Sequence, residues 1–261
     1  MEKTMGNKRE DKFIIIIPAR YGSSRFPGKP LASIAGREMI LRVCDRCAQT
    51  GIRVVVATDD LRIKECVETG GYEVVMTRGD HNSGTERVYE AYCKLGQPAE
   101  IVINVQGDEP FISPSQIEAL RDCFISSQSV GIATLIREFD KSKGFEALFD
   151  SNVVKVTRNV KGEALYFSRS IIPYVRGVNW QEWLDTTRFH THVGIYGYTG
   201  GTLGKIVALP RSPLEIAENL EQLRWLENGF RINTVTTDIP TFGIDTPSDL
   251  KAAEEYLSSM E

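Results

Sequence analysis

The sequence predicts an α/β protein built around a mainly parallel, twisted β-sheet. Two observations predict this fold class. Short apolar runs alternate with amphipathic helical patterns from residue 13 onward, as in consecutive βαβ units. The composition is also that of a globular domain, with 261 residues, 41% hydrophobic and 25% charged. Extended disorder, collagen and coiled coil are therefore excluded as descriptions of the whole chain.

The first strand is expected at Phe13–Ile17, where five consecutive apolar residues indicate burial on both faces. A helix is expected over 37–49, because Met39, Ile40, Val43 and Cys47 recur at helical spacing before Gly51 ends the pattern. The alternation continues with strands at 54–57, 73–76 and 101–105 and with helices at 61–69 and 85–95.

The second half of the chain continues the pattern less regularly. Capping boxes with proline at the first helical position predict helix starts at Ser113-Pro114 and Ser212-Pro213, and Thr246-Pro247 repeats the theme. Further strands are expected at 130–136, 153–158 and 193–198. The segment 176–190 is the least periodic and carries Trp180 and Trp183. It is interpreted either as an active-site loop or as a subunit contact.

Charge and apolar runs exclude several classes of partner. The net charge is −4 without a Lys/Arg block, so no nucleic-acid partner is expected. The longest apolar run spans five residues, Phe13 to Ile17, so no membrane span is expected. Residues 1–12 are polar and are expected to form a disordered tail rather than a secretory signal. An odd number of cysteines, five, favours free thiols in the cytoplasm.

The loop after the first strand, residues 18–30, carries a concentration of positive charge. Arg20, Arg25 and Lys29 alternate with two glycines and with the hydroxyls of Ser23 and Ser24. Backbone N–H groups and cations converging on one place suit a triphosphate. The loop has neither the P-loop pattern nor the G-x-G-x-x-G fingerprint, so a nicotinamide-dependent dehydrogenase is disfavoured.

Two aspartates follow structural boundaries at which metal ligands are common. Asp108 comes just after the strand at 101–105, and Asp245 lies in a turn before a helix. Both could bind one Mg²⁺ that also contacts phosphate, although each could equally cap local amides. Ser83-Gly84-Thr85 opens a helix and offers free amides to a base or a phosphate.

Several segments together resemble the CMP-KDO synthetase (3-deoxy-manno-octulosonate cytidylyltransferase) family. The similarity covers roughly residues 13 to 258 and depends on the order in which the segments occur. These segments are residues 16–31, 80–87, 104–110, 164–169, 192–198, 212–215, 220–224 and 243–247. The resemblance implies a Rossmann-like three-layer nucleotidyltransferase fold with a mostly parallel mixed sheet. It also implies a single domain over 13–261, with CTP bound mainly by 13–130 and with sugar binding and dimerisation mainly in 131–261.

The implied reaction joins CTP to 3-deoxy-D-manno-octulosonate (KDO), giving CMP-KDO and diphosphate for lipopolysaccharide biosynthesis, with Mg²⁺ as cofactor. By resemblance, the catalytic residues are Arg20, Lys29, Asp108 and Asp245, the last two binding the metal. The residues implied for CTP are Arg20, Ser23, Ser24, Lys29, Arg78, Ser83 and Gln106. Those implied for the sugar are Arg169, His192, Tyr196, Glu221 and Gln222.

Two alternatives to this function stay open at this point. The acceptor could be another acidic sugar, such as 8-amino-KDO or a sialic acid, because residues 176–191 do not align with the family pattern. The chain could also bind CTP without turnover, although the presence of both aspartates argues against this. The resemblance further suggests a homodimer, which composition neither supports nor opposes.

Overall fold

The computed structural model describes residues 12–22, 26–241, 243–244 and 246–258. Its main feature is a sheet of nine described strands, in which the order β11-β7-β10-β6-β1-β4-β5 forms the central path. The strands on this path are β1 (Phe13–Ala19), β4 (Arg53–Thr58), β5 (Glu73–Met76), β6 (Ile101–Asn104), β7 (Ile132–Glu138), β10 (His190–Thr199) and β11 (Ile232–Thr236). The fold class predicted from the sequence is confirmed.

Strand β10 is the element that makes the sheet mixed. It runs antiparallel to both neighbours, β6 and β7, whereas the described pairs β1–β4, β1–β6, β4–β5 and β7–β11 are parallel. The antiparallel hairpin of β8 (Lys155–Arg158) and β9 (Ala164–Ser168) branches from β10. Since β10 joins strands of the first and second halves of the chain, one continuous sheet underlies both halves.

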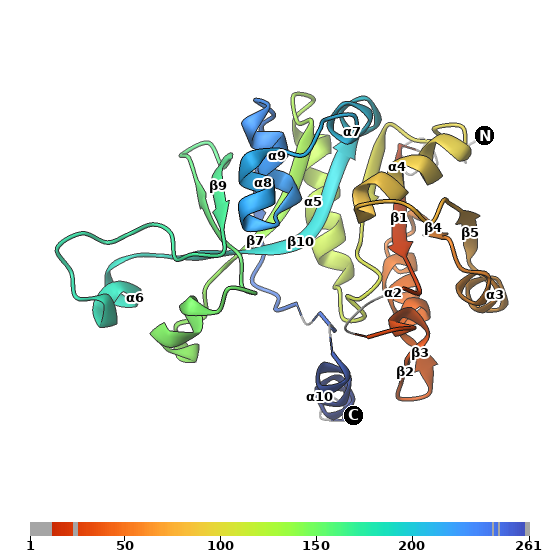
Figure 1. Cartoon of the computed structure of the whole chain (residues 1–261), viewed down its shortest axis with the longest axis horizontal. Coiled ribbons are helices and arrows are strands. Elements are labelled where there is room, and N and C mark those ends of the chain that lie inside the picture. The colour runs from red at the N-terminus through yellow and green to blue at the C-terminus, as the bar shows by residue number, and fades with distance from the viewer. Residues whose placement is uncertain (1–11, 23–25, 242, 245, 259–261) are drawn as a thin grey trace, which may run out of the picture.

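Helices cover both faces of the sheet and complete three layers (Figure 1). On one face, α2 (Met39–Ala48), α3 (Leu61–Thr69) and α5 (Pro114–Ser126) pack with Ile15 and Ile17 of β1. On the other face, α4 (Gly84–Lys94), α7 (Gly200–Val207) and α9 (Glu221–Glu227) pack with Ile14 and Ile16. The unbroken apolar run of β1 is therefore explained by burial on both faces.

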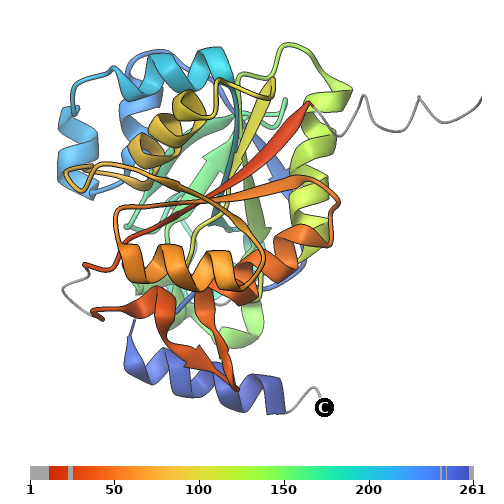
Figure 2. The same ribbon diagram turned by 90° about the vertical axis from the view of Figure 1, so that its right-hand side faces the viewer.

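The structure corrects the start of the second predicted element. Residues Arg37–Glu38 form strand β3, which pairs with β2 (Ser33–Ile34), and helix α2 begins only at Met39. Ala35 and Gly36 both have positive φ, 46° and 77°, as a two-residue hairpin turn requires. Helix α10 (Pro247–Ser258) packs near this hairpin, where Ile34, Met39, Ile244 and Ala253 share a core (Figure 2).

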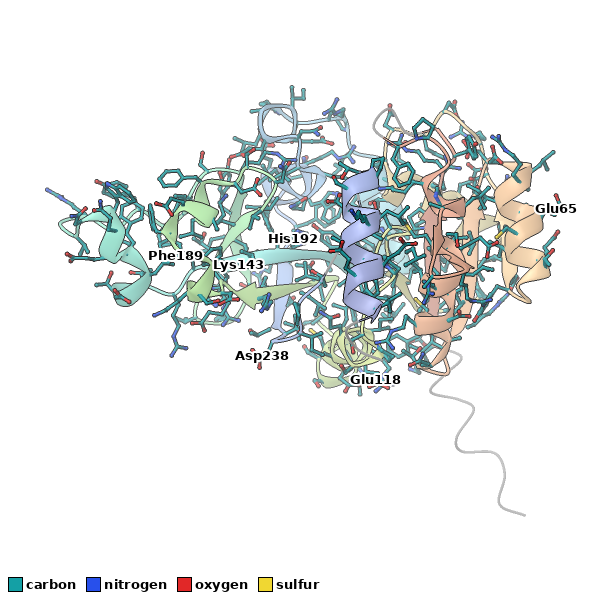
Figure 3. The ribbon with its side chains drawn as sticks, turned by 90° about the horizontal axis from the view of Figure 1, so that it is seen from below. Glu65, Glu118, Lys143, Phe189, His192 and Asp238 are labelled. Atoms are coloured by element: carbon teal, nitrogen blue, oxygen red, sulfur yellow. The ribbon has the colours of Figure 1, made fainter. Side chains whose placement is uncertain are left out.

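The segment without periodicity forms part of a protrusion, here called the aromatic arm and defined as residues 139–149 and 171–189 (Figure 1). It contains the 3₁₀ helices η2 (Lys141–Lys143), η3 (Phe145–Phe149) and η4 (Trp180–Glu182) and the short helix α6 (Trp183–Thr186). Its buried cluster is Phe139, Phe145, Leu148, Trp183, Leu184 and Phe189. In Figure 3, β10 leads from Phe189 in the arm to His192 near the body of the sheet. The remaining described elements are η1 (Lys29–Leu31) and α8 (Pro213–Glu218).

Two general expectations can be compared with the fold. All five cysteines are free thiols. None of the helices in the described ranges combines the length and the apolarity that a bilayer span requires.

Candidate active site

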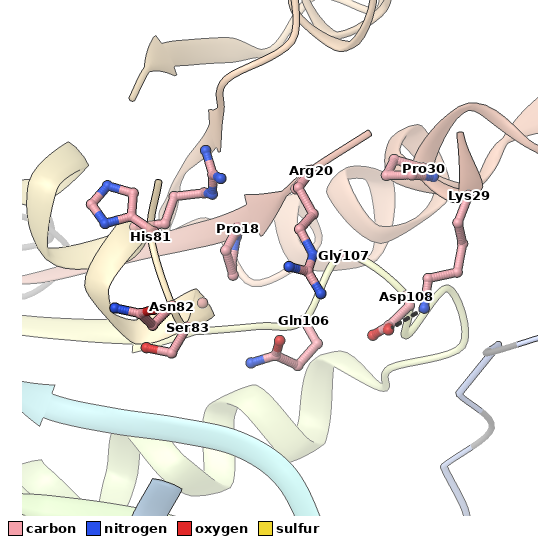
Figure 4. A pocket seen from close by; sticks show the side chains of 13 residues that line it. Pro18, Arg20, Lys29, Pro30, His81, Asn82, Ser83, Gln106, Gly107 and Asp108 are labelled. Atoms are coloured by element: carbon pink, nitrogen blue, oxygen red, sulfur yellow. Dashed lines mark hydrogen bonds and ion pairs between the residues drawn. The ribbon is translucent and has the colours of Figure 1, made fainter. Parts of the chain in front are cut away.

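A cavity of about 300 Å³ lies where the carboxyl ends of β1 and β6 meet the start of α4 (Figure 4). This is the edge at which open α/β sheets bind ligands. The lining residues come from three segments that are distant in sequence: Pro18, Ala19, Arg20, Lys29, Pro30, His81, Asn82, Ser83, Gly84, Arg87, Gln106, Gly107 and Asp108. The cavity therefore gathers most of the nucleotide residues that the sequence pointed to.

Two cations of the first loop reach this cavity. Arg20 follows β1, and Lys29 begins η1, so both are held at ends of regular structure. Gly28 has a φ of 73° and donates its N–H to Tyr21 O at 3.0 Å, which closes the base of the loop. Only glycine adopts such a backbone conformation without strain. Ser23 and Ser24, also predicted here, lie outside the described residues.

Lys29 and Asp108 form the main ion pair of the cavity. Lys29 Nζ donates to Asp108 Oδ2 at 2.6 Å, with the two side chains 13% and 35% exposed. Gly107 brings Asp108 this close to β1, because a Cβ at residue 107 would lie 2.9 Å from Pro18 O. The main-chain oxygen of Asp108 accepts from Ile244 N at 3.0 Å, and the predicted metal ligand Asp245 lies outside the described residues.

The residues predicted to read the base divide into two groups. Ser83 and Gln106 line the cavity, and Gln106 Nε2 donates to Asn104 Oδ1 at 3.3 Å. Arg78 is absent from the cavity wall, because its exposed side chain lies toward Glu90 and Asp80. The structure thus brings Ser83 and Gln106 to the cavity and does not bring the Arg78 guanidinium there.

Two cavity residues, His81 and Arg87, were missed by sequence reasoning. Arg87 is buried and donates to Thr77 Oγ1 at 2.6 Å and to Asp59 Oδ2 at 3.2 Å. It lies one helical turn after Ser83, so helical spacing could have revealed that they share a face. The His81 imidazole contacts Glu90 through Nε2 and lies 3.6 Å from Glu86 through Nδ1. For His81, the signal available in the sequence was its position in the loop after β5.

The predicted sugar residues Glu221 and Gln222 lie at the start of α9, and Glu221 contacts the cavity residue Ser83. Glu221 accepts from Ser83 Oγ at 2.9 Å and from Thr85 Oγ1 at 2.6 Å. Burial raises the pKa of Glu221, although these hydroxyls and Arg224 oppose the shift. Gln222 is buried, and its Nε2 has no hydrogen-bond partner within the described chain. This buried amide is available to donate a hydrogen bond to a polar ligand.

His192 and Tyr196 both lie on β10, close to the Glu221 carboxylate. His192 Nε2 lies 2.9 Å from Thr134 Oγ1, and its ring centroid lies 5.2 Å from that of Tyr196. Burial lowers the pKa of His192 to about 4, so its imidazole is neutral near pH 7. Burial also raises the pKa of the Tyr196 phenol, which stays protonated. Both side chains can therefore donate or accept hydrogen bonds without carrying charge.

The neutral state of His192 makes stability depend on pH. The unfolded chain, with an ordinary histidine pKa of about 6.5, binds a proton that folded His192 does not bind until about pH 4. The free energy of unfolding should therefore fall as pH drops through this window, by up to about 1.4 kcal/mol per pH unit. Urea unfolding at several pH values should show a shallower fall for His192→Gln than for the wild type. Parallel curves would contradict the shifted pKa.

Arg169 lies apart from the nucleotide cavity, just after β9. Its Nε donates to Glu218 O at 2.6 Å and its Nη1 to Ser151 O at 2.7 Å. Buried Lys155 donates to Arg169 O at 2.6 Å and fixes the backbone at this point. Arg169 lines a separate cavity of about 720 Å³ beside the aromatic arm. The structure therefore does not bring the Arg169 guanidinium together with the other predicted residues.

Asp108 is the described residue best suited to bind a metal ion in the nucleotide cavity. Its carboxylate is a hard oxygen donor, and the Lys29 ammonium already contacts one oxygen, so the position accommodates positive charge. Within the described ranges, no three His, Cys, Asp or Glu side chains are grouped as a complete metal site. A cation here would need ligands from the substrate, from water or from residues outside these ranges.

Comparisons with known proteins show which family the chain resembles. A sequence model of the family described as cytidylyltransferase matches residues 14–233. The chain is 50% identical to a 3-deoxy-manno-octulosonate cytidylyltransferase of Parabacteroides distasonis, covering 95% of this chain and 99% of the relative. It is 43% identical to the enzyme of the same name from Pseudomonas syringae pv. syringae, covering 94% and 98%.

Solved structures give the same result. A CMP:2-keto-3-deoxy-manno-octonic acid synthetase complexed with CTP superposes with a TM-score of 0.88 at 41% identity, covering 96% of this chain and 100% of the other. A 4-diphosphocytidyl-2C-methyl-D-erythritol synthase from Anaerococcus prevotii superposes with a TM-score of 0.60 at 13% identity, covering 95% and 99%. The second likeness is one of fold alone.

Proposed function

Because this chain belongs to the cytidylyltransferase family, we propose that it transfers CMP from CTP to 3-deoxy-D-manno-octulosonate and releases diphosphate. The observation that carries the proposal is the cavity that Arg20 lines together with the Lys29–Asp108 ion pair, with the polar group around Glu221 adjoining it. Two cations beside a carboxylate suit a metal-bound triphosphate, and a separate polar wall suits an acidic sugar. The product is an activated sugar for lipopolysaccharide biosynthesis.

The reaction is an in-line substitution at the α-phosphorus of CTP. The anomeric hydroxyl oxygen of the sugar forms the new P–O bond, the bond to the β-phosphate oxygen breaks, and the hydroxyl proton leaves to solvent. Such reactions need positioning and charge neutralisation more than covalent catalysis. Arg20 and Lys29 hold the triphosphate and stabilise the charge that develops on the leaving diphosphate.

Lys29 and Asp108 change partners when the nucleotide binds. In the structure, the Lys29 ammonium is paired with the Asp108 carboxylate at 2.6 Å. A triphosphate entering the cavity offers Lys29 a stronger anionic partner and frees the Asp108 carboxylate. Asp108, together with Asp245, would then hold Mg²⁺. When bound, this ion supplies Lewis-acid polarisation of phosphate oxygens and lowers the pKa of the attacking hydroxyl.

The remaining predicted residues are proposed to orient the two substrates. Ser83 and Gln106 contact the cytidine part from the cavity wall. The contributions of Ser23, Ser24 and Arg78 to CTP binding are proposed from the resemblance alone. His192, Tyr196, Glu221 and Gln222 bind the hydroxyls of the sugar. By resemblance, Arg169 would receive the sugar carboxylate, and to do so it would exchange the main-chain oxygens that its Nε, Nη1 and Nη2 now contact.

A diphosphate-release assay tests the proposal. The purified protein is mixed with CTP, UTP, ATP or GTP, and with KDO, 8-amino-KDO or a sialic acid, with and without Mg²⁺. We expect diphosphate only with CTP, an acidic sugar and Mg²⁺, and fastest with KDO. Faster release with a sialic acid would reassign the acceptor. CTP binding without any diphosphate would identify a catalytically silent nucleotide-binding protein and overturn the proposal.

We place this reaction in the cytoplasm and assign it to a single domain over residues 13–261. The five free thiols support a reducing compartment. The single domain is supported by β10, which bonds to strands of both halves. The CTP-binding half, residues 13–130, and the sugar-binding half, 131–261, therefore share one sheet.

The aromatic arm supports a homodimer. Phe149, Trp180 and Tyr174 are 62%, 44% and 76% exposed on this protrusion, next to its apolar cluster. Phe149 and Trp180 also contact each other, with ring centroids 6.3 Å apart. Adjacent exposed aromatic side chains are typical of the centre of a protein interface. We propose that a second copy of this chain binds to the aromatic arm, which belongs to the half of the chain over residues 131–261.

Charged substitutions in the arm should separate the subunits. Phe149→Glu combined with Trp180→Glu is expected to weaken dimerisation by at least about 30-fold, because two carboxylates would be buried without partners. Light scattering after size-exclusion chromatography should then show one chain mass at micromolar concentration. Leu61→Glu removes a comparably exposed apolar side chain from α3, outside the arm, and serves as the control. A dimer that persists in the double variant would exclude the arm as the interface.

A further inference from the structure

A cation–π contact connects α3 to the loop that carries the two catalytic cations. The Cζ atom of Arg62 lies 3.3 Å from the ring centroid of Tyr21, well within the range of an attractive contact. Tyr21 follows Arg20 directly, whereas Arg62 is in the first turn of α3. Arg62 is absent from the wall of the nucleotide cavity, so it does not contact a ligand bound there.

The guanidinium of Arg62 is held in place from the other side. Its Nη2 donates to Asp60 Oδ2 at 2.6 Å and its Nε to Asp60 Oδ1 at 3.0 Å, a bidentate pair. Asp60 is itself fixed, because its side chain caps α3 by accepting from Arg62 N at 2.9 Å. The Arg62 guanidinium above the tyrosine ring is therefore held by hydrogen bonds to a side chain at the start of a helix.

Tyr21 in turn contacts the far end of the loop. Its carbonyl oxygen accepts from Gly28 N at 3.0 Å. A Cβ at Gly28 would lie 3.1 Å from the Cε2, Cζ and phenolic oxygen atoms of Tyr21, so this side chain covers the backbone at the glycine. Gly28 immediately precedes Lys29, just as Arg20 immediately precedes Tyr21. One aromatic ring therefore restrains the backbone next to both cations.

We propose that Arg62 is a positioning residue for the reaction, which holds Tyr21 and through it orients Arg20 and Lys29 toward the triphosphate. This inference rests on the proposed function of the cavity but assigns a role to a side chain outside it. Arg62 is 58% exposed and pairs within its own helix start, so its loss leaves the core intact. Its effect should therefore appear in nucleotide use rather than in the stability of the fold.

Steady-state kinetics of three variants test this role. Arg62→Ala is expected to lower kcat/KM for CTP about two- to fivefold, the range set by an exposed cation–π contact, without changing the KM for the sugar or the Tm. Arg62→Lys should recover part of the loss, because it restores a cation beside the ring. Lys64→Ala, which removes another partly exposed cation of α3, should match the wild type.

Energetic coupling between Arg62 and Tyr21, measured with a double variant, gives the second test. The double variant Arg62→Ala with Tyr21→Leu should be no worse than Tyr21→Leu alone, because both changes remove the same contact. Additive losses would overturn the proposal, as would an Arg62→Ala enzyme equal to Lys64→Ala. A lowered Tm and kcat with unchanged KM would mean a merely structural role and would also overturn it. Should Tyr21→Leu fail to fold, the comparison of Arg62→Ala, Arg62→Lys and Lys64→Ala decides.

Failure of the proposed function would be visible separately. The wild-type enzyme would then release no diphosphate from CTP and KDO. In that case calorimetric titration with CTP still tests the inference, since a weaker Kd in Arg62→Ala but not in Lys64→Ala supports it. Equal Kd values in all three proteins would contradict it.

Discussion

Asp108→Ala is expected to lower kcat for diphosphate release by at least about a thousandfold at any practical Mg²⁺ concentration. The carboxylate is the described group that would hold the metal beside the triphosphate, and a metal ion stabilises transition-state charge by several kcal/mol. The ion pair with Lys29 is partly exposed, so its loss should change the free energy of unfolding by only about 1 kcal/mol. Diphosphate release measures the first effect, and thermal unfolding measures the second.

Two controls make this result specific. Asp122→Ala removes a 58% exposed carboxylate from α5, away from the cavity, and should leave turnover unchanged. Mn²⁺ binding followed by electron paramagnetic resonance in the presence of CTP should be weakened in Asp108→Ala only. An Asp108→Ala enzyme within tenfold of wild-type turnover would remove Asp108 from the metal site.

Lys29→Met is expected to cost about 2–4 kcal/mol of transition-state stabilisation, equivalent to a loss of about 30- to 900-fold in kcat/KM. The change keeps an apolar stem of similar length and removes the charge that faces the leaving diphosphate. Stopped assays with saturating KDO and varied CTP measure the loss. Lys64→Ala, which removes a partly exposed cation from α3, again serves as the control.

Lys29→Met should also have a second effect, of opposite sign, on the affinity for metal. Without nucleotide, the ammonium of Lys29 competes with metal for Asp108 at 2.6 Å, so Lys29→Met should bind Mn²⁺ more tightly than the wild type. A nonspecific defect would weaken metal binding and nucleotide use together. Turnover within tenfold of wild type, or unchanged metal affinity, would refute the exchange of partners between Lys29, Asp108 and the triphosphate.

The parts of the fold that could be predicted are those with strong local patterns. The run Phe13–Ile17 and the helix from Thr85 coincide with β1 and α4, because burial on both faces and helical spacing leave clear signals. Strand β11 was missed, since its sequence mixes polar and apolar residues and its pairing with β7 joins segments far apart in the chain. The helix was predicted to begin at Arg37, whereas Arg37–Glu38 form β3 and pair with β2, because two residues are too few to show a periodicity.

The candidate site was predictable where residues follow strands. Arg20, Gln106 and Asp108 come directly after β1 or β6, and a parallel sheet brings those ends together. The position of Arg169 was not predictable, because it depends on main-chain oxygens of Ser151 and Glu218 in other segments. The contact between Arg62 and Tyr21 was equally hidden, since it joins α3 to a loop that is distant in sequence.

The antiparallel strand β10 constrains how the enzyme can move during turnover. It shares ladder hydrogen bonds with β6 on one side and β7 on the other. A jaw-like closure that separated the two halves at β10 would have to break one of those ladders. We therefore expect rearrangement to take place in connecting loops and side chains, so that residues of the sugar-binding half can change while the nucleotide half keeps its shape.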